Sequence, residues 1–188
     1  MRACSLFAVV LICLCSVSFA NEIQLVRFSE DPWPPYTYGE EGQSPTGGIA
    51  VDVVNEIFTR LGVPTDLQLF PWKRCLAQME SGERDALMLL GYSEEREEYL
   101  AYTESIMVVK DLLYYNIESS PIEWETYEDL KGYSFARTFG FQYGRGFEDA
   151  VTEYGIVMHE APSDENSFKM LAHGRIDAFI CNEVTART

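Results

Sequence analysis

Hydrophobic residues follow two spacings along the first half of the chain, one typical of strands and one typical of helices. The pattern predicts strand, helix, strand, helix and strand over residues 23–28, 51–61, 67–70, 71–79 and 85–90. Gly62 and Gly82 follow the two helical segments, where glycine commonly ends a helix. After Asp85, the segment 85–90 is a continuous hydrophobic run, as in a strand covered on both faces. This alternation predicts an α/β fold with a mostly parallel sheet.

The second half repeats the same order of elements. Strands are predicted over residues 133–137, 156–159 and 176–181, and helices over residues 142–154 and 163–173. In addition, residues 79–87 align with residues 171–179, each giving a helix end, a glycine, a short turn, Asp-Ala and a hydrophobic strand. A helix end followed by a glycine and a turn is common in α/β chains. Together with the matching order of helices and strands in the two halves, however, the repeat favours two similar lobes. Residues 107–115 predict a long strand that crosses from one lobe to the other.

The first twenty residues have the pattern of a signal peptide. Arg2 precedes a hydrophobic run over residues 6–14, and small residues occupy positions 18 and 20. We expect cleavage after Ala20 and export, with a retained anchor as the alternative. Of the five cysteines, only Cys75 and Cys181 would remain. Two buried free thiols are favoured over a disulfide bridge between them.

Composition narrows the range of functions. The chain has 30 acidic and 14 basic side chains, a formal charge of -16, which disfavours nucleic acid as a partner. Only two histidines are present, without the spacing of a metal site. Neither a nucleophile elbow nor a dinucleotide fingerprint occurs, so no catalytic residues, metal or cofactor are predicted. These observations favour a binding protein over an enzyme.

Arg96 is the first candidate for binding, because it follows the predicted strand at residues 85–90. Ligands of such sheets bind beyond the carboxyl ends of the strands, where a guanidinium could hold a carboxylate through two hydrogen bonds. The alternative is an exposed arginine paired with neighbouring glutamates. Three aromatic residues also follow predicted strand ends and could either wall a cleft or cap a core: Trp33, Tyr36 and Trp72.

Six short motifs occur in an order that resembles a known family. They are residues 34–36, 48–52, 82–86, 93–96, 130–132 and 174–178. The chain resembles family 3 extracellular solute-binding proteins, the periplasmic receptors of polar amino-acid ABC transporters. The resemblance implies a monomer with the two-lobed periplasmic-binding-protein (Venus-flytrap) fold, with lobes at residues 21–107 and 108–188. Such a receptor closes on a small solute and delivers it to an inner-membrane permease.

The resemblance also assigns roles to individual residues. Arg96 matches the arginine that holds the α-carboxylate of the solute, helped by backbone amides near Gly91 and in the turn after Gly140. Trp33 and Trp72 match residues that line the pocket for the solute's side chain. Independently, residues 141–142 are expected to open a helix whose free N–H groups favour an anion, which adds Phe141 and Gln142 to the candidate site.

Two departures from the family pattern put amino-acid specificity in doubt. Asn182 stands where amino-acid-binding members carry the aspartate that pairs with the solute's ammonium group. Gly91 and Phe141 stand where hydroxyl side chains usually help. A carboxylate or another polar small solute remains the expected ligand. Glu183 could instead pair with an ammonium, although a solvated carboxylate at the start of a helix is its favoured role.

The chain ends at Thr188, whereas family members usually continue and complete the first lobe. We therefore expect a fragment or a truncated gene product. Two other functions remain open. One is a periplasmic dehydratase resembling the cyclohexadienyl type, with Glu30, Asp31 or Glu183 as the acid. The other is the sensor input domain of a kinase.

Overall fold

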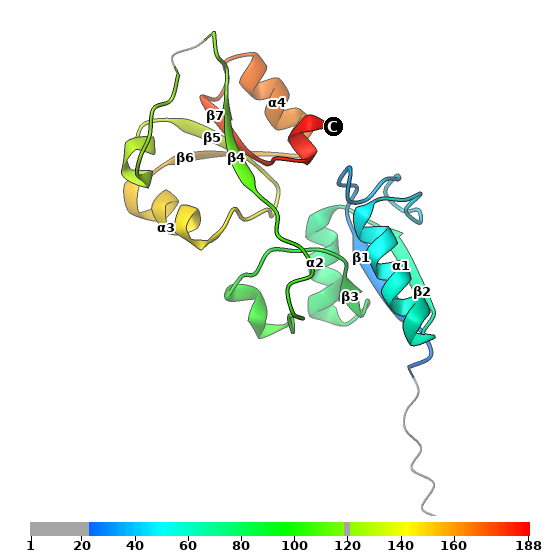
Figure 1. Cartoon of the computed structure of the whole chain (residues 1–188). Helices are drawn as coiled ribbons and strands as arrows, with labels where there is room; N and C mark the ends of the chain where they lie inside the picture. Colours follow the sequence, from blue (N-terminus) through cyan, green and yellow to red (C-terminus); the bar gives the residue numbers. More distant parts are fainter. Residues whose placement is uncertain (1–22, 119–120) are drawn as a thin grey trace, which may run out of the picture.

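The computed structural model describes residues 23–118 and 121–188. Its elements form two lobes, each with its own sheet, joined by the segment that leads into β4 (Asp111–Tyr115). Figure 1 shows the lobe of β1 to β3 below and to the right of the lobe of β4 to β7. The predicted signal peptide lies outside the described residues. Among the described residues, no helix has the length and hydrophobicity needed to cross a membrane.

The first lobe contains a parallel three-stranded sheet in the order β2-β1-β3. Its elements are β1 (Val26–Glu30), α1 (Ile49–Leu61), β2 (Thr65–Leu69), α2 (Trp72–Ser81), β3 (Ala86–Leu87) and the short 3₁₀ helix η1 (Glu95–Glu98). Gly62 and Gly82 end α1 and α2 in left-handed conformations, as predicted. The expected order of elements in the first half is therefore confirmed.

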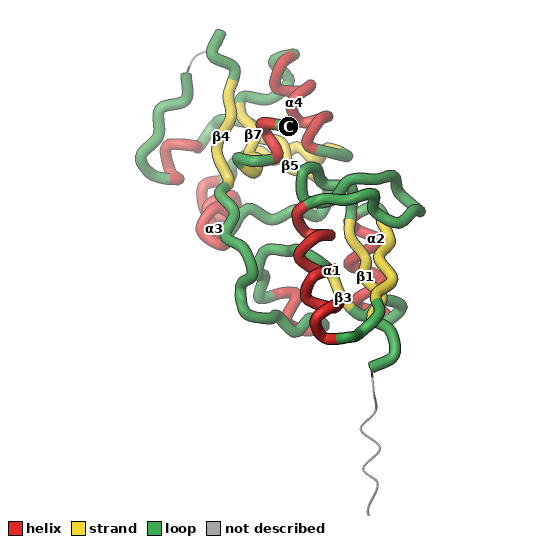
Figure 2. Tube along the Cα trace, turned by 45° about the vertical axis from the view of Figure 1, so that its right-hand side comes forward, coloured by secondary structure: helices red, strands yellow, loops and turns green. Residues whose placement is uncertain are grey.

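Alternation along β1 places α1 and α2 on opposite faces of this sheet. Phe28 packs in a hydrophobic cluster with Val51 and Val54 of α1. The next residue, Ser29, donates a hydrogen bond from Oγ to Gln78 Oε1 of α2, over 2.8 Å. Successive side chains of a strand point to opposite faces, so one helix covers each side of the sheet. Figure 2, turned from the first view, shows α1 in front of this sheet.

The second lobe contains a four-stranded mixed sheet in the order β4-β7-β5-β6, in which only β4 is antiparallel to its neighbour. After β4 come η2 (Tyr127–Leu130), β5 (Ser134–Thr138), α3 (Arg145–Tyr154), β6 (Val157–Ala161), α4 (Asp164–Ala172), β7 (Ala178–Asn182) and η3 (Thr185–Arg187). Phe135 packs in a cluster with Phe147 of α3, and Ala136 packs in one with Leu171 of α4. The two lobes therefore share one arrangement of helices on both faces.

The aspartates of the repeated Asp-Ala sequence make the same hydrogen bonds in both lobes. Asp85 accepts a hydrogen bond from the Arg27 backbone N–H, and Asp177 accepts one from the Ser134 backbone N–H. In turn, each aspartate donates its own N–H to the carbonyl of the same partner, over 2.9 Å in both cases. Each aspartate thus fixes the strand that follows it against an inner strand of its sheet, β1 in the first lobe and β5 in the second.

The boundaries of several predicted elements differ from the structure; the strand expected at residues 23–28, for example, is β1, which begins at Val26. The strand expected at residues 85–90 is shorter, because β3 ends at Leu87. The next two backbone N–H groups, of Met88 and Leu89, donate to the Glu30 carboxylate instead of to a neighbouring strand. The crossing strand expected from residue 107 begins at Asp111. The helix expected from residue 142 begins at Arg145, because Gly144 has φ 76° and ψ 145°, outside the helical region.

The two cysteines of the described chain are free and buried, as favoured from the sequence. Cys75 lies on α2, where its thiol is 3.6 Å from the Phe70 carbonyl oxygen. Cys181 lies on β7 in the other lobe. Burial raises the pKa of both thiols, so both remain protonated at neutral pH.

Candidate functional site

A cavity of about 110 Å³ lies between the two lobes. Its wall combines residues that follow the strands of the first lobe with residues of β4, of β7 and of the turn after β5. The lining residues are Glu30, Asp31, Trp33, Trp72, Leu89, Leu90, Gly91, Arg96, Val109, Asp111, Phe141, Gln142, Tyr143, Asp164, Cys181 and Asn182. Below we call this space the interlobe cavity. A wider space of about 690 Å³ shares five of these residues and adjoins it.

Arg96 lies in η1 and reaches the interlobe cavity with only 6% of its surface exposed. Its Nη2 donates a hydrogen bond to the Gly140 carbonyl oxygen of the other lobe, over 3.0 Å. Its guanidinium carbon also lies 5.8 Å from the centre of the Trp72 ring, as in a cation–π contact. Within residues 23–118 and 121–188, no carboxylate forms an ion pair with this guanidinium, so the alternative of an arginine paired with neighbouring glutamates is wrong.

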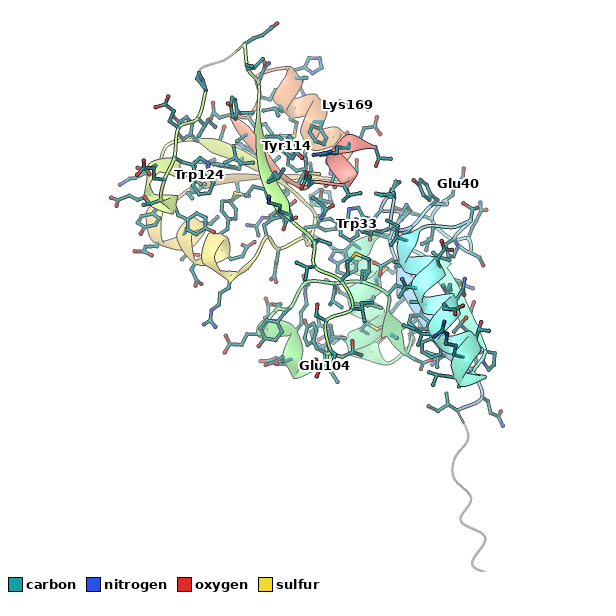
Figure 3. All side chains as sticks on the ribbon, viewed as in Figure 1. Trp33, Glu40, Glu104, Tyr114, Trp124 and Lys169 are labelled. Atoms are coloured by element: carbon teal, nitrogen blue, oxygen red, sulfur yellow. The ribbon has the colours of Figure 1, made fainter. Side chains whose placement is uncertain are left out.

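Aromatic rings from both lobes form one side of the cavity. The Phe141 ring contacts Trp33 and Trp72 edge to face, with ring centres 6.0 and 6.1 Å apart. Because Phe141 belongs to the second lobe and the two tryptophans to the first, these contacts cross the junction. Figure 3 labels Trp33, which lies where the two lobes meet. Trp33 and Trp72 therefore line the cleft, whereas Tyr36, the third aromatic residue of the same prediction, does not.

Two of the predicted site residues support the cavity from behind, since neither is among its lining residues. Tyr36 is 2% exposed, and its hydroxyl donates to Asn182 Oδ1 across the junction, over 2.9 Å. The Gly140 carbonyl accepts Trp72 Nε1 at 3.1 Å as well as Arg96. Gly91, Phe141, Gln142 and Asn182 do line the cavity.

The expectation that residues 141–142 offer a helix N-terminus to an anion is wrong. The Phe141 N–H donates to the Thr138 carbonyl in a turn, over 2.9 Å. The Tyr143 N–H donates to the Glu148 carboxylate, over 3.0 Å, so a side chain of α3 already occupies the start of that helix. Gln142 therefore reaches the cavity as part of a loop.

Two adjacent carboxyl groups, of Glu30 and Asp31, line the cavity at the end of β1. Glu30 is 1% exposed, and its Oε2 accepts the N–H groups of Met88 and Leu89, over 3.0 and 2.9 Å. Burial, and then the neighbouring charge of Asp31, raise the pKa of Glu30 well above its usual range. Burial also raises the pKa of Asp31 to about 7. Burial thus favours the neutral form of both carboxyl groups, and Asp31 is partly protonated at neutral pH.

Two further acids of the second lobe line the cavity, and the sequence analysis did not single them out. Asp164 opens α4 and accepts the Thr138 hydroxyl proton at 2.5 Å, and burial raises the pKa of its carboxyl. Asp111 opens β4, opposite Asn182 in the antiparallel ladder. Asp164 could have been found as a residue that follows a strand in an α/β pattern. By contrast, Glu183 pairs with Arg187 and does not line the cavity.

The family model of bacterial extracellular solute-binding proteins, family 3, matches residues 25–170. The chain belongs to this family. The probable amino-acid-binding protein YxeM of Bacillus subtilis (strain 168) is 21% identical over 147 residues, which are 78% of this chain and 54% of that protein. This family 3 chain thus spans about half the length of the curated relatives it matches.

Solved structures show the same fold. The holo form of ArgBP from T. maritima has a TM-score of 0.69 and 23% identity, covering 89% of this chain and 72% of that one. The ancestral amino acid-binding protein AncCDT-1, described as a precursor of cyclohexadienyl dehydratase, has a TM-score of 0.70 and 19% identity, covering 87% and 73%. The predicted two-lobed, mostly parallel α/β fold and the family resemblance are therefore confirmed.

The raised pKa of Asp31 makes the stability of this solute-binding protein dependent on pH. The folded state keeps the Asp31 proton up to about pH 7, whereas an unfolded aspartate releases it near pH 3.9. The folded state then binds more protons within this window, so its stability is full below it and falls as pH rises through it. Each pH unit in this window corresponds to about 1.4 kcal/mol, so we expect a loss of about 2–3 kcal/mol between pH 5 and pH 8.

Urea denaturation at the two pH values would measure this loss. Asp31→Asn removes the titrating group and should reduce the difference, whereas Asp52→Asn, on the exposed face of α1, should not. The pKa of Asp85 is lowered to about 2, chiefly by its hydrogen bond with Arg27, so its opposite effect falls below this range. An equal loss in wild type and Asp31→Asn would contradict the assignment.

Proposed function

We propose that this protein is a periplasmic receptor that captures a small, polar, carboxylate-bearing solute, an amino acid or a related acid, for an ABC importer. In this proposal the signal peptide of residues 1–20 directs export, and residues 21–107 and 108–188 form the lobes that close on the solute. The partners are the solute and an inner-membrane permease, and the receptor acts as a monomer without a cofactor or metal. Family membership and the interlobe cavity support this function.

The buried guanidinium of Arg96 is the observation that carries the proposal. Removing a charge from water is costly unless an opposite charge or hydrogen bonds compensate for it. Arg96 is 6% exposed, and the described residues supply one hydrogen bond, to a neutral carbonyl, and no carboxylate. A solute carboxylate bound through the remaining N–H groups would supply the missing charge in the planar geometry that guanidinium favours.

Closure is supported by contacts that join the lobes around the cavity. The Gly140 carbonyl accepts hydrogen bonds from Arg96 and Trp72, and Lys73 approaches Glu160 at 3.7 Å. Because Arg96 would contact both the solute and the second lobe, binding of the solute would favour the closed arrangement. A ligand shifts such an equilibrium only as far as its affinities for the two states differ.

The test measures solute binding by wild-type protein and Arg96→Ala. A melting-shift screen over amino acids, dicarboxylates and aromatic acids would identify the best ligand, and calorimetry would give its affinity. We expect at least a tenfold loss of affinity in Arg96→Ala, equal to about 1.4 kcal/mol.

Arg96→Lys keeps the charge without the planar fork, so its affinity should fall between those of wild type and Arg96→Ala. Arg60→Ala, a variant of an arginine on α1 whose side chain is 78% exposed, serves as the matched control. Unchanged affinity in Arg96→Ala would remove this residue from the site.

A dehydratase of the cyclohexadienyl type is the second candidate, and Asp31 is the observation that favours it. A general acid works best when its pKa lies near the pH of operation, and the pKa of Asp31 is raised to about 7 beside the cavity that holds Arg96. Elimination of a leaving group needs such a proton donor. Consumption of prephenate or arogenate by the purified protein, lost in Asp31→Asn, would replace the receptor proposal. Ligand-induced melting shifts without product would support the receptor.

A further inference from the structure

The orientation of the Asn182 side-chain amide is fixed by its neighbours. Its Oδ1 accepts the Tyr36 hydroxyl at 2.9 Å and the backbone N–H groups of Val184 and Thr185 at 3.0 and 3.3 Å. Backbone N–H groups can only donate, so the atom that receives two of them must be the oxygen. The Nδ2 amino group is therefore the other branch of the amide.

That amino group is a buried donor without an acceptor. Asn182 is 4% exposed, and its Nδ2 finds no hydrogen-bond partner among the described residues of the chain. Trp33 Nε1 is in the same condition, and both residues line the interlobe cavity, one from each lobe. Most buried N–H groups in proteins are hydrogen-bonded, so each exception calls for a partner. Because both residues line the interlobe cavity, a solute bound there is the candidate partner for both N–H groups.

We infer that the solute presents a hydrogen-bond acceptor oxygen to Asn182 Nδ2, beside the carboxylate held by Arg96. This inference rests on the proposed function, since it uses the same cavity and the same arginine. An ammonium group has three donors and no acceptor, so an α-amino group cannot satisfy Nδ2. A keto oxygen or a hydroxyl oxygen can. The cavity thus selects 2-oxo or 2-hydroxy carboxylic acids over the corresponding amino acids.

The size of the cavity places the acceptor next to the carboxylate. Its volume of about 110 Å³ is somewhat below the roughly 150 Å³ of an engineered cavity that binds benzene. Such a space holds the head group of an acid, that is, the carboxylate and the carbon beside it. The rest of the solute would extend into the adjoining space of about 690 Å³, which is lined partly by Trp33, Trp72 and Phe141.

Asp111 is the competing partner for an amino acid. It lies opposite Asn182 in the ladder between β4 and β7, and it also lines the cavity. A solute ammonium could bind this carboxylate, leaving Asn182 Nδ2 without an acceptor. However, Asp111 is exposed and can be hydrated without a solute, whereas the Asn182 amino group is buried. The unmet donor therefore favours the oxygen-bearing acid, and the experiment includes Asp111→Asn.

The experiment compares acids that differ only at the second carbon. The two sets of probes are phenylalanine, phenyllactate and phenylpyruvate, and glutamate, 2-hydroxyglutarate and 2-oxoglutarate. Calorimetry with the full chain should show that, in the set with the better-fitting side chain, an oxo or hydroxy acid binds at least tenfold tighter than the amino acid. Asn182→Asp replaces the donor with a carboxylate oxygen, and it should reverse this preference.

Asn182→Asp retains an oxygen for Tyr36, Val184 and Thr185, so it should keep the fold, and its melting temperature without probes would check this. Tighter binding of the amino acid by wild type would overturn the inference, and loss of that binding in Asp111→Asn would assign the ammonium to Asp111. Equal binding within each set, or a preference that Asn182→Asp leaves unchanged, would also overturn it. Binding of amino acids that depends on Arg96 would leave the receptor function standing, whereas binding of no acid at all would remove both proposals.

Discussion

Gly48→Ala should lower the free energy of unfolding by about 2–6 kcal/mol. Gly48 precedes α1 with φ 128°, a region that residues with a side chain rarely adopt, at a cost of about 1–3 kcal/mol. In addition, a Cβ would overlap the Tyr36 carbonyl oxygen and lie 2.6 Å from the carbonyl carbon of that residue and 2.9 Å from Thr37 Cα. These are backbone atoms, so relief requires a shift of the segment, and overpacking of this kind costs about 1–3 kcal/mol more.

Gly42→Ala is the matched control for that variant. Gly42 also has a positive φ, of 81°, but a Cβ there would meet no atom within 4 Å. We expect it to cost about 1–2 kcal/mol, which reflects backbone strain alone. Urea denaturation followed by circular dichroism would measure both. Equal losses in the two variants would show that close approach to residues 36–37 contributes nothing.

Phe135→Ala should lower the free energy of unfolding by about 3–5 kcal/mol. Phe135 lies on β5 with no exposed surface and packs edge to face on Phe147, with ring centres 5.8 Å apart. Truncation removes most of a ring from the main hydrophobic cluster of the second lobe and leaves a cavity that neighbouring residues fill only in part.

Phe139→Ala provides the comparison for that core variant. Phe139 follows the same strand but is 37% exposed, so its truncation should cost about 1 kcal/mol or less. Denaturation midpoints for the two variants would be compared at one pH. A loss of under 1 kcal/mol for Phe135→Ala would contradict the central place of this ring in the second lobe.

Local sequence determines most of the helices and strands. The spacing of hydrophobic residues predicted α1 and α2. Gly62 and Gly82 predicted where these helices end, and both glycines adopt left-handed conformations there. The Asp-Ala repeat predicted two similar lobes, and Asp85 and Asp177 each bind an inner strand of their sheet. These features depend on residues near one another in sequence or on one aspartate in a fixed position.

Contacts between distant residues account for what the sequence did not predict. β3 is short because Glu30, which is 58 and 59 positions away, accepts the N–H groups that would extend it. Likewise, no pattern indicated that Glu148 would accept the Tyr143 N–H and so exclude an anion from the start of α3. Such side-chain hydrogen bonds to the backbone leave no periodic trace in the sequence.

The candidate site was predicted in part. Arg96, Trp33 and Trp72 reach one cavity, as the resemblance implied, whereas Tyr36 supports it through Asn182. Two acids of the second lobe were missed: Asp164 follows a predicted strand but was not singled out, whereas the place of Asp111 in the cavity depends on how the lobes meet. The unpartnered Asn182 amino group could not be foreseen either, since three donors must first be placed around its oxygen.

The Gly140 carbonyl has a consequence for how this protein can diverge. It is a main-chain atom, and it receives both Arg96 and Trp72 of the opposite lobe. Exchange of the side chain at position 140 cannot delete this acceptor, although φ 77° favours glycine there. Residues that determine solute specificity can therefore change during evolution while the hydrogen bonds to this carbonyl keep the two lobes in the same relative position.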